Sequence, residues 1–237
     1  MKTPSVLVRS LAALSLLAGL VAAPASAQNL FFNGTPNGLD ALSSDFNTGV
    51  SQSMVYDDFV VGGSGWNVTD LYGLFVGTVQ WQGAQWEIRS GMSTGNGGTL
   101  VQSGSGAVTQ TDELTSPFSL EEYQAHISGL SFFLAPGTYW MGISVVGNGT
   151  GGDFVTTTSG ASGVNSNING SGFWNSSFFA VDFVPTTDVA SDETDFSYGI
   201  GGTLADVSSV PEPSTMALLA TGLVGMAGAG MKRRRRK

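Results

Sequence analysis

Short runs of alternating apolar and polar residues fill the middle of the chain, separated by clusters of Gly, Asn and Ser. In the clearest run, residues 137–146, every second residue from Tyr139 to Val145 is apolar. Because successive side chains of a strand point to opposite faces, this run predicts a strand with one face in a core and a mixed opposite face. The other predicted strands are residues 54–61, 68–76, 84–90, 99–103, 127–134, 153–158, 173–183 and 196–201.

The number and spacing of these runs predict an all-β fold with a single domain. Short strands separated by turn residues are typical of a β-sandwich or a jelly-roll-like fold. Helical periodicity is nearly absent, and only residues 119–125 predict a helix of about two turns, with Ser119 as its cap. Loops rich in Gly, Asn and Ser are expected at residues 148–152 and 159–172, and an acidic loop at residues 186–195.

The first 27 residues combine the three parts of a secretory signal peptide. Lys2 and Arg9 give a basic start, residues 11–23 form an apolar run, and residues 25–27 are small. The apolar run is too short for a spanning helix, which requires roughly 20 residues. The pattern predicts cleavage before Gln28 and export of residues 28–209 as an extracellular domain.

The C-terminal end has an apolar stretch followed by a basic cluster. Residues 214–231 are 18 uncharged residues, and Lys or Arg fills every position of residues 232–237. The stretch is close to the lower limit for a spanning helix, roughly 17 residues, and a basic cluster beside such a helix stays on the cytoplasmic side. This arrangement predicts a transmembrane helix that leaves the domain on the other side of the membrane.

Residues 210–237 resemble the PEP-CTERM sorting tail of exported bacterial proteins, because Pro211, Glu212 and Pro213 precede an apolar helix and an Arg-rich end. By this resemblance, the three residues are the recognition motif of a membrane transpeptidase of the exosortase type, which removes the helix and releases or re-anchors the protein. The two prolines also keep the motif extended and outside the helix. The resemblance further implies a place at the cell surface or in the exopolysaccharide matrix of a biofilm.

Charge is distributed unevenly along the chain. Eight of the nine basic residues lie in the first ten or the last six positions, so Arg89 is the only one between Gln28 and Val210. That interval contains 17 acidic residues, which gives a formal charge of 1 − 17 = −16. Nucleic acid is a disfavoured partner because phosphate binding requires clustered Lys and Arg. The chain has no Cys, which excludes disulfides and thiolate chemistry.

Aromatic side chains are the candidates for binding a glycan. Trp81, Trp86 and Trp174 could stack on the apolar faces of sugar rings, and the amides between the first two suit hydroxyl recognition. Arg89 could bind the carboxylate of a uronic acid. The alternatives are core packing for the indoles and an ion pair between Arg89 and Glu87, which share one face of a predicted strand.

Acidic segments are the candidates for binding calcium, which takes oxygen ligands. One segment is Asp57-Asp58, and the other is the acidic loop, whose predicted ligands are Asp188, Asp192, Glu193 and Asp195. A divalent ion would relieve the repulsion among these carboxylates. The alternative is a solvated acidic loop, because the twelve-residue EF-hand pattern is absent.

No catalytic motif is assembled in the sequence. His126 is the only imidazole base, and no Gly-x-Ser-x-Gly nucleophile elbow is present. The sequence therefore predicts a non-catalytic structural or polysaccharide-binding module, sorted to the cell surface through its tail. One alternative is a carbohydrate-active hydrolase or lyase with paired carboxylates, drawn from Glu87, Glu113, Glu121 and Glu122. Another is a structural protein that self-associates through sheet edges.

Overall fold

The computed structural model describes residues 28–47, 51–77, 80–112, 121–147, 152–189 and 194–205. The predicted signal peptide, the sorting motif and the predicted transmembrane helix lie outside these residues, as do Glu113, Asp192 and Glu193. None of the described segments contains a helix of the length and hydrophobicity that crossing a membrane requires.

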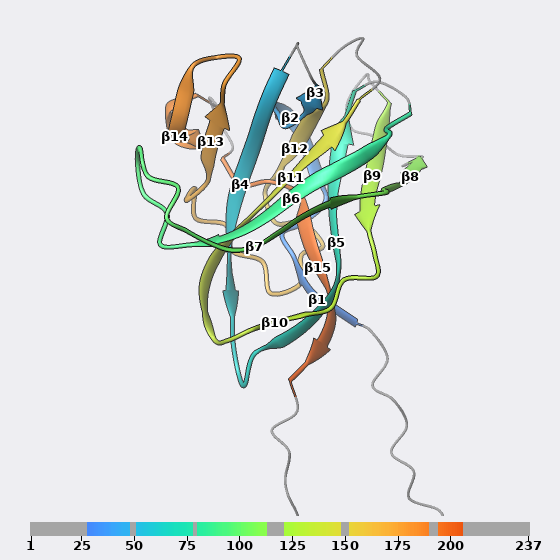
Figure 1. The fold of residues 1–237 in the computed structure, drawn as a ribbon, viewed down its shortest axis with the longest axis vertical. Coiled ribbons are helices and arrows are strands. Elements are labelled where there is room, and N and C mark those ends of the chain that lie inside the picture. Colours follow the sequence, from blue (N-terminus) through green and yellow to red (C-terminus); the bar gives the residue numbers. More distant parts are fainter. Residues whose placement is uncertain are drawn as a thin grey trace, which may run out of the picture.

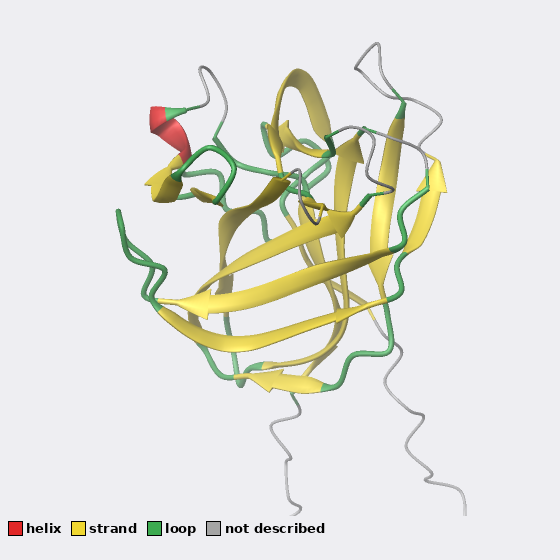
Figure 2. Ribbon diagram, turned by 45° about the horizontal axis from the view of Figure 1, so that its top comes forward, coloured by secondary structure: helices red, strands yellow, loops and turns green. Residues whose placement is uncertain are grey.

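Two antiparallel sheets pack face to face (Figures 1 and 2). The first, sheet A, contains β1 (Gln28–Phe32), β2 (Pro36–Ser43), β5 (Trp66–Val76), β8 (Thr109–Asp112), β9 (Glu122–Ile127), β10 (Phe132–Leu134), β12 (Phe154–Thr158) and β15 (Tyr198–Leu204). The second, sheet B, contains β3 (Phe46–Asn47), β4 (Ser51–Val61), β6 (Gly83–Ser90), β7 (Thr99–Gly106), β11 (Gly137–Val146), β13 (Phe173–Ser176) and β14 (Val181–Pro185). A short 3-10 helix, η1 (Thr186–Asp188), follows β14. The described residues thus confirm an all-β fold of the sandwich type.

Long strands occupy the middle of each sheet. In sheet A, β5 pairs with β15 and β12 along one edge and with β9 and β10 along the other. Sheet B has the order β14-β13-β4-β11-β6-β7. Most paired strands are therefore not consecutive in the sequence, so the whole fold decides which side chains become neighbours.

The apolar faces of the two sheets form one core. Met141, Ile143 and Val145 of β11 are fully buried, which confirms the face predicted from alternation. Phe59 of β4 stacks on Trp66 of β5 with ring centroids 6.0 Å apart, so this contact joins sheet B to sheet A. Large rings at such contacts bury much apolar area and hold the sheets together.

The predicted helix at residues 119–125 is wrong over its described part. Glu122–Ile127 forms β9, which lies between β5 and β8 and pairs with both. Ala125 and Ile127 of this strand are buried in the core. Backbone pairing on two sides satisfies the peptide groups of β9, and this outweighs the weak capping pattern.

Two predicted strands are each divided in the structure. Residues 127–134 contain the end of β9, a turn and β10, while residues 173–183 contain β13, a turn at residues 177–180 and most of β14. β13 and β14 form an antiparallel hairpin at one end of sheet B. The division of residues 173–183 places two aromatic residues on a turn.

Candidate functional site

A hollow of about 420 Å³ lies on the outer face of sheet B, beside the β13–β14 hairpin. Most of its lining residues on β4, β6 and β11 alternate with residues of the core, so their side chains point away from the core. The lining combines amide, hydroxyl and carboxylate groups with apolar surface, and includes Phe46, Gln52, Met54, Tyr56, Glu87, Asn175 and Asp182. We call this feature the outer hollow.

Arg89 is bound within the protein next to the outer hollow. Its Nε atom donates to Glu87 Oε2 at 2.6 Å, and its Nη1 atom donates to the Gly97 carbonyl oxygen at 3.0 Å. The guanidinium carbon lies 5.2 Å from the centroid of Phe183 and 5.7 Å from that of Tyr56. The ion pair with Glu87, which was the alternative to binding a uronic acid, is confirmed.

Glu87 also accepts a hydrogen bond of 2.8 Å from the hydroxyl of Tyr56. Burial raises the pKa of Tyr56 far above its ordinary value, and the adjacent negative charge of Glu87 raises it further. Tyr56 therefore remains a hydrogen-bond donor at any physiological pH. Together with Arg89 it fixes the orientation of the Glu87 carboxylate at the edge of the outer hollow.

Of the three tryptophans predicted to bind sugar, two are buried and one is half-buried. Trp86 and Trp174 are 6% and 7% exposed, so neither presents a ring face to solvent. Trp86 stacks on Phe132 with centroids 5.5 Å apart. Trp81 is half-buried and donates from Nε1 to Asp153 Oδ1 at 3.0 Å. The burial of Trp86 and Trp174 contradicts their predicted role in sugar binding and confirms the alternative of core packing for these two rings. The role of Trp81 stays a prediction.

Phe178 and Phe179 form an exposed aromatic pair that was not predicted from the sequence. They are 60% and 53% exposed, and their ring centroids are 4.8 Å apart. Both belong to the turn between β13 and β14, and Ser177 and Ala180 of the same turn line the outer hollow. The signal that could have located the pair is Asn175-Ser176-Ser177, because these residue types favour turns.

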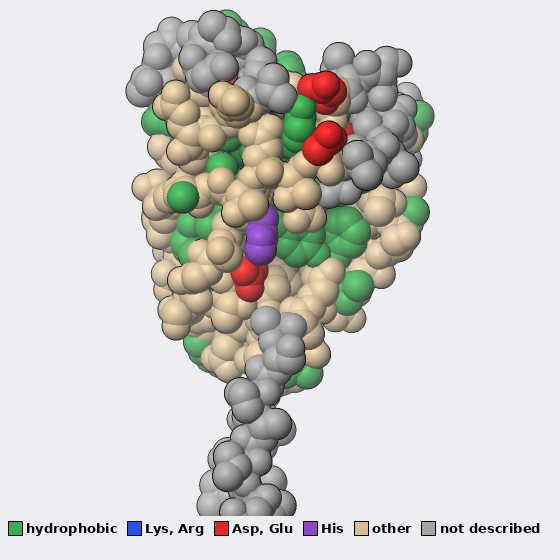
Figure 3. Space-filling model, turned by 90° about the vertical axis from the view of Figure 1, so that its right-hand side faces the viewer, with side chains coloured by type: hydrophobic (Ala, Val, Ile, Leu, Met, Phe, Trp, Pro, Cys, Tyr) green, Lys and Arg blue, Asp and Glu red, His purple; other side chains and the backbone are tan. Residues whose placement is uncertain are grey.

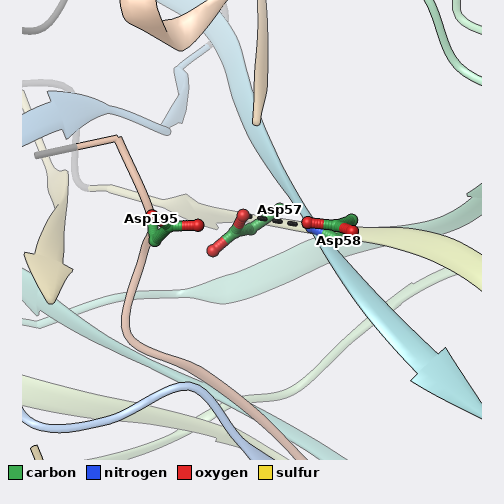
Figure 4. A group of neighbouring side chains, drawn as sticks. All are labelled: Asp57, Asp58 and Asp195. Atoms are coloured by element: carbon green, nitrogen blue, oxygen red, sulfur yellow. Dashed lines mark hydrogen bonds between the residues drawn. The ribbon is translucent and has the colours of Figure 1, made fainter. Parts of the chain in front are cut away.

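Three buried carboxyl groups meet at the edge of β4, in what we call the acidic cluster. Asp57 and Asp58 come from β4, and Asp195 comes from the segment that precedes β15 (Figure 4). One carboxylate oxygen from each residue lies within 4.8 Å of the others. The three residues are 2%, 4% and 3% exposed, so water reaches the cluster poorly.

Amide groups surround the acidic cluster. Asp57 Oδ2 accepts hydrogen bonds from the Asn33 side chain at 2.8 Å and from the Phe196 backbone at 2.6 Å. Asp58 Oδ2 accepts from the Nδ2 atoms of Asn167 and Asn169, at 2.7 and 3.1 Å. The predicted loop at residues 159–172 therefore folds over the cluster and is held to it by two asparagine side chains.

Backbone N–H groups of the same loop bind the third carboxylate. Asp195 Oδ1 accepts from the amides of Asn169 and Gly170, both at 3.1 Å. Burial raises the pKa of Asp57 well above its ordinary value, and the nearby Asp195 raises it further. Burial is also the main cause of the raised pKa values of Asp58 and Asp195. The cluster thus resists holding three negative charges at once.

The predicted calcium ligands are only partly brought together. Asp195 belongs to the acidic cluster, where its partners are Asp57 and Asp58 rather than the acidic loop. Asp188 is exposed on η1, and Asp192 and Glu193 lie outside the described residues. The sequence identified all three members of the cluster as calcium candidates but assigned them to separate segments.

His126 lies on a different face of the molecule. Its Nε2 atom is 3.2 Å from Asp70 Oδ1, and its ring meets Tyr72 edge-on with centroids 6.4 Å apart. Figure 3 shows this side of the protein, where a histidine, acidic groups and hydrophobic side chains are in view but no Lys or Arg of the described residues is. The imidazole is thus paired with a carboxylate at the surface.

Comparison with known proteins identifies one element of the chain. Residues 209–236 match the PEP-CTERM protein-sorting motif. No curated protein and no solved structure matches the chain. The match confirms the resemblance of the tail, so the chain carries the C-terminal signal of an exported exosortase substrate, which is anchored transiently in the membrane before processing.

Proposed function

We propose that this exported protein is a non-catalytic module of the cell surface or biofilm matrix that binds extracellular polysaccharide through the outer hollow and the Phe178–Phe179 pair. The observation that carries the proposal is the position of two exposed aromatic rings beside a polar hollow. The sorting motif in the tail, which directs the protein to exosortase processing, is consistent with this location.

The chemistry of the two features suits a sugar polymer. An aromatic ring offers a flat apolar surface to the apolar face of a pyranose, while amides, hydroxyls and carboxylates bind the hydroxyl groups around the ring. Exposed Phe side chains next to each other are costly in water and indicate an interaction surface. Gln52, Asn175 and Asp182 supply the polar groups in the outer hollow.

Co-sedimentation with the exopolysaccharide of the producing organism tests the proposal. We expect the exported protein, recovered from the producing cells, to pellet with the polymer without releasing reducing sugar. Replacing both rings, Phe178→Ala with Phe179→Ala, should weaken binding at least about tenfold, the effect typical of losing a hot-spot contact. The matched control is Phe133→Ala, because Phe133 is 51% exposed on β10 of the other sheet. Unchanged binding of the double variant would contradict the proposal.

A second candidate function is a hydrolase or lyase that uses paired carboxylates. The observation that favours it is that Glu87 and Asp182 line the same hollow, since glycoside hydrolysis requires two carboxyl groups across the scissile bond. Release of reducing sugar that is abolished by Glu87→Gln would establish the enzyme. Self-association through sheet edges is distinguished by sedimentation that depends on protein concentration in the absence of glycan.

A further inference from the structure

The acidic cluster holds three carboxyl groups without a basic side chain to balance them. Arg89 is the only Lys or Arg between residues 28 and 210, and it is bound to Glu87. The single histidine, His126, is paired with Asp70. Buried carboxylates are stable only when they are paired, protonated or bound to a metal. A positive charge from outside the chain is therefore needed if the cluster is to be ionised at neutral pH.

One oxygen atom of the cluster lacks a hydrogen-bond partner. Asp58 Oδ1 is buried, and no donor among the described residues reaches it. The same carboxyl group receives two amide hydrogen bonds on its other oxygen, Oδ2. A buried polar atom without a partner is uncommon and indicates an ion or water that completes the site.

We propose that Asp57, Asp58 and Asp195 bind a calcium ion at the edge of β4, beneath the loop of residues 159–172. The spacing of the oxygens fits such an ion. Calcium lies about 2.3–2.6 Å from each oxygen ligand, so two ligands on opposite sides of it are roughly 4.6–5.2 Å apart. The oxygens of the cluster lie within 4.8 Å of one another.

The ligand types select a hard cation. The cluster offers oxygen atoms from three carboxylates and no nitrogen or sulfur ligand, which excludes metals that prefer imidazole or thiolate. Calcium accepts irregular coordination with a variable number of ligands, whereas magnesium requires a nearly ideal octahedron of six. A site built from one strand and one irregular segment therefore suits calcium better than magnesium.

The ion would join three parts of the chain that are remote in sequence. Asp57 and Asp58 belong to β4, Asp195 precedes β15, and Asn167 and Asn169 hold the loop against Asp58. Calcium would neutralise the repulsion between the carboxylates and fix the loop to both sheets. This function is structural and independent of polysaccharide binding at the outer hollow.

Thermal unfolding in chelator and in calcium tests the proposal on the exported protein recovered from the producing cells. Extracellular modules bind calcium with a Kd of about 0.1–1 mM. We expect calcium chloride at about 10 mM to raise the melting temperature by about 3–10 °C over the value in chelator. Magnesium chloride and sodium chloride of equal ionic strength should give a much smaller rise.

The variant Asp58→Asn separates a metal site from a simple hydrogen-bond network. Its amide keeps one oxygen for Asn167 and Asn169 and places an NH₂ group where Asp58 Oδ1 lacks a partner. In chelator we expect the variant to melt above the wild type, because one of three repelling charges is gone. Adding calcium should leave the melting temperature of the variant at its value in chelator. The matched control Asp188→Asn removes an exposed carboxylate and should respond to calcium as the wild type does.

Terbium provides a second measurement, because it replaces calcium and emits when nearby tryptophan is excited. Trp140 of β11 pairs with Asp58 in the register of sheet B, so its ring is the expected donor. We expect luminescence that calcium displaces and that Asp58→Asn abolishes. The proposal is overturned if calcium leaves the wild-type melting temperature unchanged, if magnesium acts equally, or if Asp58→Asn keeps the calcium response.

Discussion

Asp57 and Asp58 are consecutive residues of one strand, so their side chains leave opposite faces of sheet B. Asp57 shares its face with Val55 and Phe59 of the core, while Asp58 is on the face of Tyr56. The last pair between β4 and β13 is Tyr56 with Phe173, so the next residues of β4 lie beyond the end of β13. Because β13 does not cover this edge of β4, the carboxylates from both faces can reach Asp195 at the edge of the strand.

The raised pKa values of these carboxyl groups predict how stability depends on pH in the presence of chelator. The unfolded chain loses its carboxyl protons near pH 4, whereas burial lets the folded Asp58 keep its proton to higher pH. Above about pH 4 the folded state therefore binds more protons, so Asp58 lowers the free energy of unfolding as pH rises. One such group contributes at most about 1.4 kcal/mol per pH unit.

Urea unfolding of the wild type and Asp58→Asn between pH 4 and pH 7 measures this contribution. We expect the variant to gain stability relative to the wild type as the pH increases. A difference between the two proteins that is constant over this range would show that Asp58 titrates normally in the folded state.

Among the secondary-structure elements, the β13–β14 hairpin contains a turn whose position the local sequence pattern did not predict. Residues 173–183 contain enough apolar side chains for one strand, but the chain turns at residues 177–180. Ala180 adopts a positive φ of 53° there, which few residues other than glycine do. The turn exposes Phe178 and Phe179, whereas Trp174 of β13 remains buried.

Two strands of sheet A, β2 and β8, were not predicted because their own sequences carry little strand signal. β2 contains Pro36, Gly38 and Asp40, and β8 consists entirely of polar residues. β1 begins at the predicted cleavage site and pairs with β15. These segments are strands because neighbouring strands offer them hydrogen-bond partners, which is a tertiary effect.

Close packing between β15 and β5 leads to a stability prediction. Gly199 of β15 pairs with Tyr72 of β5, and a Cβ atom added to Gly199 would collide with the tyrosine ring. We expect Gly199→Ala to lower the free energy of unfolding by about 1–3 kcal/mol, the usual cost of overpacking. Urea unfolding of Gly106→Ala is the control, because a Cβ atom at Gly106 meets nothing within 4 Å. Equal stability of the two variants would contradict the packing argument.

In the whole molecule, the two ends of the described domain lie together and away from the proposed binding surface. Gln28 of β1 pairs with Gly202 of β15, so the first and last described residues leave the sandwich side by side. Figure 1 shows these strands in the lower half and the β13–β14 hairpin at the upper end. A protein held by its C-terminal tail would therefore present the Phe178–Phe179 pair away from its attachment point.

Net charge gives a prediction about the kind of polysaccharide. Residues 28–210 carry a formal charge of −16, and Arg89 is bound to Glu87, so an anionic polymer is repelled by the domain as a whole. In chelator at low salt, we expect a neutral polysaccharide to bind more tightly than an anionic one. Sodium chloride should reduce the difference, because screening shortens the range of repulsion. Preferential binding of the anionic polymer at low salt would contradict this expectation.

The sequence alone determined the fold class and the sorting motif, and it indicated the ion pair of Arg89 as one of two alternatives. These depend on local features: alternation along residues 137–146, a motif of contiguous residues and two charges on one strand face. Only the tertiary structure decided that Trp86 and Trp174 are buried and that Asp195 joins Asp57, from which it is 138 residues distant in sequence. Alternation says which side chains share a face of a strand, but it does not say which strands are neighbours or where a strand edge is open.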